Sequence, residues 1–228
     1  MKILIIRPQP GNDASAARAQ KAGHTPIQLP FFEVRMRDWD APDPAQFDAL
    51  LITSANAVRH AGNQLDAFAA LPVHAVGRNS ADAVRAVGFN LASTGNTGAE
   101  QAIDNAREAG HRRLLWLAGE DQTAFAVPAD MHIETRVVYA ADPIELGEDA
   151  QQMVLQADVV ALHSARAAEH FAHFVDAAGL DRSSIALAAF SQGIADAAGH
   201  GWRAIAVAER PEDQALLSAA HTLVRIAP

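Results

Sequence analysis

Short runs of apolar residues alternate with longer alanine-rich stretches along most of the chain. Strand candidates, most of them predominantly apolar, are residues 3–6, 26–29, 49–52, 74–76, 114–117, 134–139, 159–162, 185–189 and 204–207. Stretches with helical spacing, which often begin on a capping residue and end on glycine, are residues 14–23, 54–62, 79–88, 97–110, 164–179, 191–199 and 211–226. Strands that are apolar throughout are typical of parallel sheets with helices on both faces. The pattern therefore predicts an α/β fold.

Two extended segments, residues 29–44 and 137–149, interrupt this alternation and carry proline. Proline restricts the residue before it to extended conformations, so both segments are expected to be chain crossings rather than tight turns. We expect two similar parallel-sheet α/β domains joined by a two-stranded extended linker, the first domain being discontinuous. The predicted boundaries are residues 1–34 plus 143–228 for that domain, 40–138 for the inserted domain, and 35–39 and 139–142 for the linker strands.

A repeat supports the division into two similar domains. Residues 48–60 read DALLITSANAVRH and residues 158–170 read DVVALHSARAAEH, with five of thirteen positions identical at an offset of 110 residues. A second similarity follows each copy, at residues 77–89 and 191–202, with a shared Ala-Asp-Ala core and a closing Gly-aromatic pair. The two similarities occur in the same order at nearly the same spacing, as expected for two related domains.

Each copy ends its strand on a polar residue followed by serine, Thr53-Ser54 and His163-Ser164. Such a serine caps the next helix, and the remaining backbone N–H groups at the positive helix end can bind an anion. Ligands of open parallel sheets bind at this carboxyl edge. A single serine here is more often only a cap, but the paired arrangement predicts two edges that hold a multiply charged anion in one cleft.

Composition limits the kinds of partner and bound group that we expect. Eighteen Lys and Arg against 27 Asp and Glu give a net charge of −9, which disfavours nucleic acid as a partner. The apolar run near the N-terminus, residues 3–6, is too short for a signal peptide or a membrane span. A cytoplasmic protein without membrane contact is therefore expected. No phosphate-binding glycine loop is present, and the spacing of His163, His170 and His173 matches no zinc motif, so we expect no metal.

Several segments together resemble the uroporphyrinogen-III synthase family. They are RPQP at 7–10, ITSANAV at 52–58, AVGRNSADAV at 75–84, VVY at 137–139 followed by Pro143, and LHSARAAEHF at 162–171. The resemblance covers residues 2–217 and implies a lyase of tetrapyrrole and heme biosynthesis. Such an enzyme takes hydroxymethylbilane, expels its hydroxyl as water, inverts the terminal pyrrole through a spiro intermediate and closes the macrocycle. The resemblance implies no cofactor. The two slim extended connectors suggest a monomer with mobile domains.

The resemblance also implies site residues. Tyr139 matches a tyrosine at the family's cleft and would donate a hydrogen bond to the leaving oxygen, although packing between the domains is an equally good role for it. The implied substrate-binding residues are Arg7, Thr53, Ser54, Ala55, Asn56, Gly77, Arg78, Asn79, Ser80, Gly119, His163, Ser164, Ala165, Arg166, Ser191 and Gln192.

Three departures from the family pattern bear on the site. Asn56 stands where many relatives have a basic residue, so Arg78 is the candidate to supply that charge. Residues 191–194, Ser-Gln-Gly-Ile, replace a Gly-Pro-Thr-Thr turn. The helix expected after Gly119 has at most two turns. A second hypothesis therefore stays open: a non-catalytic cytoplasmic two-domain protein that binds an anion or a tetrapyrrole.

Overall fold

The computed structural model describes residues 1–96, 98–122 and 124–224. Thr97, the expected first residue of a helix, and residues 225–226, the expected end of the last helix, lie outside the described residues. The chain forms two compact units, which we call the first and the second unit. The first comprises Met1–Glu33 and Asp142–Pro228, and the second comprises Val34–Ala141.

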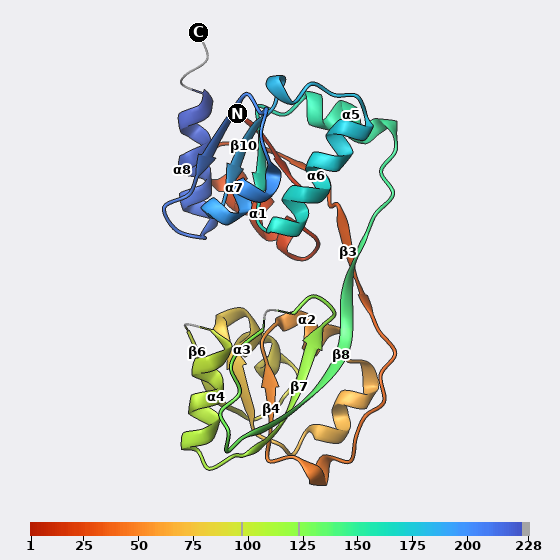
Figure 1. The fold of residues 1–228 in the computed structure, drawn as a ribbon, viewed down its shortest axis with the longest axis vertical. Helices are drawn as coiled ribbons and strands as arrows, with labels where there is room; N and C mark the ends of the chain where they lie inside the picture. Colours follow the sequence, from red (N-terminus) through yellow and green to blue (C-terminus); the bar gives the residue numbers. More distant parts are fainter. Residues whose placement is uncertain (97, 123, 225–228) are drawn as a thin grey trace. The chain divides into compact units, whose positions relative to one another are not determined.

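The first unit contains a five-stranded sheet in the order β11-β10-β9-β1-β2 (Figure 1). Its strands, all paired in parallel, are β1 (Lys2–Ile5), β2 (Thr25–Gln28), β9 (Val159–Leu162), β10 (Ala186–Ala189) and β11 (Ala204–Val207). Its helices are α1 (Gly11–Lys21), α5 (Glu148–Leu155), α6 (Ala165–Ala177), α7 (Gln192–Ala198) and α8 (Asp213–Val224), with a 3-10 helix at Arg182–Ser184. Both ends of the chain thus contribute neighbouring strands, since β1 lies between β2 and β9.

The second unit contains a six-stranded sheet in the order β3-β8-β7-β4-β5-β6. Its strands are β3 (Phe32–Met36), β4 (Ala49–Ile52), β5 (Val73–Val76), β6 (Leu91–Gly95), β7 (Arg113–Gly119) and β8 (His132–Pro143). Its helices are α2 (Ala55–His60), α3 (Gly77–Ala86) and α4 (Ala99–Glu108), with 3-10 helices at Pro44–Gln46 and Gly62–Phe68. The pairs from β8 through β7, β4 and β5 to β6 are parallel, which confirms the expected fold class.

Burial explains why the strands read as unbroken apolar runs. In β4, Leu50 packs into a core with Phe68 and Leu115 on one face of the sheet. Leu51, the next residue, packs on the opposite face with Ile103 and Leu114. Both faces are therefore covered, and successive side chains of a central strand are all excluded from water.

The repeated aspartate at the start of each copy ties neighbouring strands together. Asp48 Oδ2 accepts hydrogen bonds from the backbone N–H groups of Arg112 and Arg113, both at 2.8 Å. Asp158 Oδ2 accepts one from the N–H of Lys2 at 2.7 Å. The two backbone hydrogen bonds hold the pKa of Asp48 below its usual value. These carboxylates act locally at the amino ends of the strands, away from the carboxyl edge.

The structure corrects several expected elements. Strand β6 and helix α5 were not among the predicted elements, because LASTG and EDAQQMVL carry weak patterns of their type. Strand β8 runs for twelve residues, so the expected strand at 134–139 and the expected linker at 139–142 form one continuous strand. The short helix expected after Gly119 does not appear in the described part of residues 120–131.

Candidate functional site

A pocket of about 490 Å³ opens in the second unit where β4 and β7 end. Four residues proposed from the sequence line it: Thr53, Ser54, Gly119 and Tyr139. The structure thus brings together parts of three strands that are separated by up to 86 residues in the sequence, which follows from the parallel order β8-β7-β4. Carboxyl ends of parallel strands share one edge, so the side chains that follow them converge.

The ring of Tyr139 lies directly over Gly119. A Cβ atom at position 119 would be 2.6 Å from Tyr139 Cζ and 2.8 Å from its hydroxyl oxygen. The backbone also fixes this pair, because the N–H of Glu120 donates to the carbonyl of Tyr139 at 2.9 Å. Within the described residues the Tyr139 hydroxyl has no hydrogen-bond partner. Glycine at 119 therefore makes room for a phenol whose O–H remains available to a ligand.

Two hydroxyls stand at the end of β4 beside this phenol. Trp116 Nε1 donates to Thr53 Oγ1 at 3.0 Å, so the Thr53 hydroxyl accepts from the protein and keeps its own proton for another acceptor. Ser54 caps α2, its Oγ accepting from the N–H of Asn56 at 3.2 Å. The carbonyl of Ser54 accepts a hydrogen bond from the N–H of Ala57 at 3.1 Å. The expected capping role of Ser54 is observed, and both hydroxyls can still donate into the pocket.

The pocket walls are aromatic and acidic. Trp116 and Phe125 pack with ring centroids 4.7 Å apart, and both line the pocket. Glu100 and Asp121 also line it, whereas no Lys or Arg is among its described lining residues. The pocket therefore suits a flat, electron-rich or cationic ring, and its side chains do not by themselves attract a carboxylate.

In the first unit, the loop after β1 is fixed by Asn12. This fully buried side chain donates from Nδ2 to the carbonyls of Ile5 and Arg7, at 2.8 and 2.9 Å. The Arg7 guanidinium then folds back over α1, since a Cβ at Gly11 would lie 2.5 Å from its Nε. Arg7 Nη1 donates to Ser15 Oγ at 3.2 Å. Arg7 is thus held by its own loop, a constraint that the sequence reasoning missed.

Asp213, the first residue of α8, accepts hydrogen bonds from several polar side chains that lie near Arg7. Its carboxylate accepts from Ser15 Oγ at 3.1 Å, from Arg18 Nη1 at 2.7 Å and from His163 Nε2 at 3.1 Å. Only 9% of its side chain is exposed. We call Arg7, Ser15, Arg18, His163 and Asp213 the aspartate network. It contains a carboxylate of the chain itself, bonded to His163 and close to Arg7, two of the residues that the resemblance implied would bind the substrate.

Charge states in the network follow from burial and partners. Burial by itself would raise the pKa of Asp213, but hydrogen bonds from His163 and Ser15 and the charge of Arg18 lower that pKa to about 2. Burial lowers the pKa of His163 despite the hydrogen bond to Asp213. With Asp213 ionised, Nε2 of a neutral His163 carries the proton, and the buried Nδ1 is an acceptor without a hydrogen-bond partner among the described residues.

The turn at Ser164 repeats the cap of Ser54. Ser164 Oγ accepts from the N–H of Ala167 at 3.2 Å, and its carbonyl accepts from the N–H of Ala168 at 3.0 Å. The side chain of Arg166 stacks on Phe32, with its Cζ 4.7 Å from the ring centroid. The backbone of Ala165 follows the cap at the start of α6.

The remaining predicted residues are dispersed. Gly77, Arg78, Asn79 and Ser80 open α3, outside the described lining of the second-unit pocket, and Ser80 is buried with 4% of its surface exposed. Ser191 precedes α7 without a side-chain cap bond.

Two further amides are engaged within their own helices. Gln192 donates to Asp196 at 2.7 Å, and Asn56 accepts from Arg59 Nη1 at 3.2 Å. Neither side chain lines the second-unit pocket.

No group of three or more potential metal ligands occurs among the described residues. No helix in the described part of the chain is long and apolar enough to cross a membrane.

Solved structures share this architecture. The uroporphyrinogen-III synthetase of Helicobacter pylori aligns with a TM-score of 0.66 and 16% identity, covering 97% of this chain and 99% of that one. A mutant uroporphyrinogen III synthase of Thermus thermophilus aligns with a TM-score of 0.52 and 16% identity, covering both chains completely. A comparison with curated proteins found no match. The chain therefore has the two-domain α/β fold of these structures.

The family model described as uroporphyrinogen-III synthase HemD matches residues 13–218, nearly the whole chain. The chain belongs to the uroporphyrinogen-III synthase family. It is a cyclising hydro-lyase of tetrapyrrole biosynthesis, as its resemblance to the family implied.

Proposed function

We propose that this chain converts hydroxymethylbilane into uroporphyrinogen III and that the second-unit pocket holds the pyrrole ring carrying the hydroxymethyl group. The observation that carries this assignment is the Tyr139 ring over Gly119, beside Thr53 and Ser54, with a hydroxyl that has no hydrogen-bond partner among the described residues. Such a phenol hydroxyl is suited to donate a hydrogen bond to a leaving oxygen.

The first step is loss of the hydroxyl. The pyrrole nitrogen lone pair pushes electrons toward the hydroxymethyl carbon, the C–O bond breaks, and its electron pair leaves with the oxygen as water. The proton of that water comes from solvent or from the hydrogen-bonded phenol of Tyr139, which recovers it from the medium. Because the pyrrole itself drives the departure, the enzyme needs only a modest hydrogen-bond donor and close control of geometry.

Departure of the hydroxyl leaves positive charge on the ring, which explains the acidic walls. Glu100 and Asp121 line the pocket, and negative charge close to a developing cation lowers the barrier that leads to it. The faces of Trp116 and Phe125 add attraction for a cation through their quadrupoles. The pocket is therefore suited to the reacting ring rather than to the substrate's carboxylates.

Carboxylates of the substrate need donors elsewhere. The hydroxyls of Thr53 and Ser54 can donate at the end of β4, and the backbone of Ala55 begins the adjacent helix. The other residues inferred from the resemblance, including Ser164 and Arg166, remain proposed substrate contacts.

A coupled assay tests the function. Hydroxymethylbilane is generated enzymatically in the presence of this chain, the products are oxidised, and the porphyrin isomers are separated. Type III product is expected, because spontaneous closure without ring inversion gives the type I isomer. Type I product alone, at every concentration of the chain, would favour the non-catalytic tetrapyrrole-binding alternative, which the family match does not support.

A cytoplasmic monomer remains the expectation from the sequence. Each unit encloses its own hydrophobic core, which supports independent units in a single chain. Size-exclusion chromatography with light scattering and fractionation of cells test the two parts of this expectation.

A further inference from the structure

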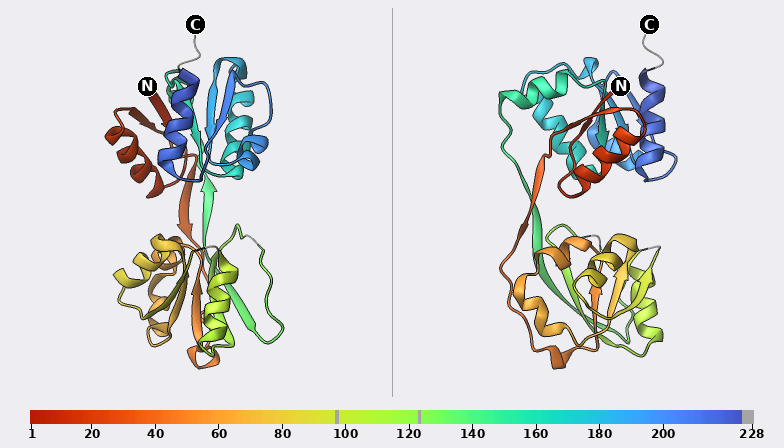
Figure 2. Two further views of the ribbon diagram at one scale, coloured as in Figure 1. Left: turned by 90° about the vertical axis from the view of Figure 1, so that its left-hand side faces the viewer. Right: turned by 180° about the vertical axis from the view of Figure 1, so that it is seen from behind.

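Two helices from opposite ends of the chain, α1 and α8, lie side by side in the first unit (Figure 2). A groove of about 850 Å³ runs between them. Four groups that are cationic or can become so line it: Arg18, Lys21, His24 and His221. No Asp or Glu is among its described lining residues. This concentration of positive groups is unexpected in a chain with a net charge of −9 that has only two lysines.

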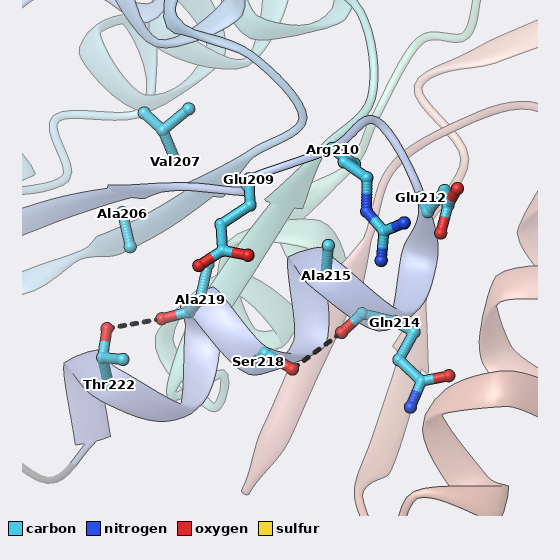
Figure 3. Close-up of a pocket in the computed structure, with 10 residues that line it drawn as sticks. All are labelled: Ala206, Val207, Glu209, Arg210, Glu212, Gln214, Ala215, Ser218, Ala219 and Thr222. Carbon is cyan, nitrogen blue, oxygen red and sulfur yellow. Dashed lines mark hydrogen bonds between the residues drawn. The ribbon is translucent and has the colours of Figure 1, made fainter.

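A second pocket adjoins this groove along α8 and shares Gln214, Ser218 and Thr222 with it. Figure 3 shows the neighbouring pocket between β11 and α8, of about 690 Å³, in which Glu209 and Glu212 accompany a single Arg210. The hydroxyls of Ser218 and Thr222 face their own helix there, donating to the carbonyls of Gln214 and Ala219 at 3.0 and 2.7 Å. The basic groove and the more acidic pocket thus meet along α8, and the cationic lining residues Lys21, His24 and His221 belong to the groove alone.

Part of the groove's positive charge is not neutralised. Arg18 is paired with Asp213 at 2.7 Å. Lys21 has no ion-pair partner among the described residues. The rings of His24 and His221 face each other, with centroids 6.2 Å apart, and neither makes a hydrogen bond within the described part of the chain.

These groups repel one another. Burial lowers the pKa of His24, and the positive charges of the Met1 amino group and His221 lower it further. An anion placed between the two rings would oppose this repulsion and favour the protonated imidazole of His24. Binding of an anion and uptake of protons are therefore linked.

We propose that the groove between α1 and α8 binds a small metabolite with several phosphate or carboxylate groups, held by Lys21, His24 and His221. Arg18 would contribute to one end of the ligand while remaining bonded to Asp213. Since Asp213 also bonds His163 at the carboxyl edge, the ligand would touch the aspartate network through Arg18. This site is separate from the second-unit pocket, and its existence does not depend on the proposed function.

Calorimetric titration of the full chain with pyrophosphate and with citrate tests the site. At about pH 6 we expect binding of at least one anion with a dissociation constant below about 1 mM. At about pH 8 the affinity falls about tenfold, because binding is linked to proton uptake by His24, which is less favourable at higher pH. Preference for either anion supports the site and identifies its chemistry.

The variant Lys21→Gln/His221→Gln is expected to weaken binding at least about tenfold, since two of the charges that hold the ligand are removed. Arg85→Gln is the charge-matched control, because Arg85 pairs only with the exposed Asp82 in the second unit, and it should bind as the unmodified chain does. Proton NMR of the unmodified chain gives an independent measurement, in which the ligand should raise the pKa of the His24 ring. Absence of binding of both anions at about pH 6, or equal binding by the double variant, would overturn the proposal.

Discussion

The turn at Ser54 in the second unit and the turn at Ser164 in the first begin their helices in the same way, yet their surroundings differ. Each serine caps a helix through its Oγ and its carbonyl. Ser54 lines a pocket with aromatic and acidic walls, in which the Tyr139 hydroxyl has no hydrogen-bond partner within the described part of the chain. The residue before Ser164, His163, is instead bonded to a buried carboxylate of the chain itself. The same serine-capped turn can therefore have different roles in the two units, and the surrounding side chains determine each role.

This contrast separates capping from ligand binding. Both serines satisfy helix N–H groups, which is worth about 1 kcal/mol in either unit. Beside the second-unit turn, the Thr53 and Tyr139 hydroxyls have no hydrogen-bond acceptor among the residues that the structure describes. The aspartate network instead supplies its own anion to Arg7, so its first role is to hold the two chain ends together.

The largest effect is expected from filling the space above Gly119. Gly119→Ala places a methyl group 2.6 Å from Tyr139 Cζ, so the ring must move away. We expect kcat/KM for type III product to fall about 100-fold, since a shift of this size misaligns the leaving oxygen. Gly147→Ala is the control, because nothing lies within 4 Å of a Cβ there. Equal activity of the two variants, with thermal melting showing both folded, would contradict the placement of Tyr139.

Removing the internal carboxylate should destabilise the first unit without such a loss of catalysis. Asp213→Asn leaves Arg18 and His163 without their charged partner, and we expect the free energy of unfolding to fall by about 2 kcal/mol. Asp82→Asn, at an exposed ion pair, should change it by less than about 0.5 kcal/mol. Urea denaturation measures both. Equal stabilities would show that the network contributes little to the fold.

Acid should weaken the second unit first. His74 is buried, with Nδ1 bonded to Ser93 at 2.8 Å and Nε2 to His111 at 2.9 Å. Burial, with the positive charge of His111, lowers the pKa of His74 to about 4, from 6.5 in an unfolded chain. The unfolded state binds more protons in this window, so stability falls as pH drops from 6.5 toward 4, by about 2 kcal/mol near pH 5.

The first unit differs because Asp213 favours the protonated form of His163 and so opposes the loss of stability that burial of this histidine would cause in acid. The stability that Asp213 itself contributes disappears only as pH falls from 3.8 toward 2. Hydrogen exchange of amides in each unit, measured near neutrality and near pH 5, follows the two separately. His74→Gln should flatten the acid dependence of the second unit. Parallel weakening of both units, unchanged by this variant, would refute the prediction.

A smaller effect is expected from the acidic wall of the pocket. Glu100→Gln removes negative charge near the developing cation, and we expect kcat to fall about tenfold. KM should stay the same or decrease, because the polyanionic substrate is repelled less. Glu108→Gln, at the exposed end of the same helix, is the control, and Glu100→Asp should recover most of the rate. A rise in KM with kcat unchanged would assign Glu100 to substrate binding.

The sequence predicts much of this fold because its strands are buried on both faces. Runs such as residues 49–52 and 159–162 are apolar throughout, and their repeat marks two related halves. The pattern fails where a strand lies at a sheet edge, as in β6, whose LASTG sequence has one large apolar residue followed by small and polar ones. Sheet order comes from long-range pairing, which no local window contains.

The candidate site could be predicted only in part. Strand-end rules identify Thr53 and Ser54, and the resemblance to the family identifies Tyr139. Asp213 could not be found this way, because it joins Arg18 across 195 residues and reads locally as an ordinary acidic residue in the first turn of a helix. The tertiary structure alone reveals that it bonds His163, one of the residues that the resemblance implied would bind the substrate.

The most direct test of the central claim is the turnover rate of Tyr139→Phe. This change removes one hydroxyl and keeps the ring over Gly119, so substrate binding should persist. Loss of one hydrogen bond to the leaving oxygen predicts a kcat for type III product about three- to tenfold lower. An unchanged kcat, in a variant that binds hydroxymethylbilane as tightly as the unmodified chain, would contradict the account.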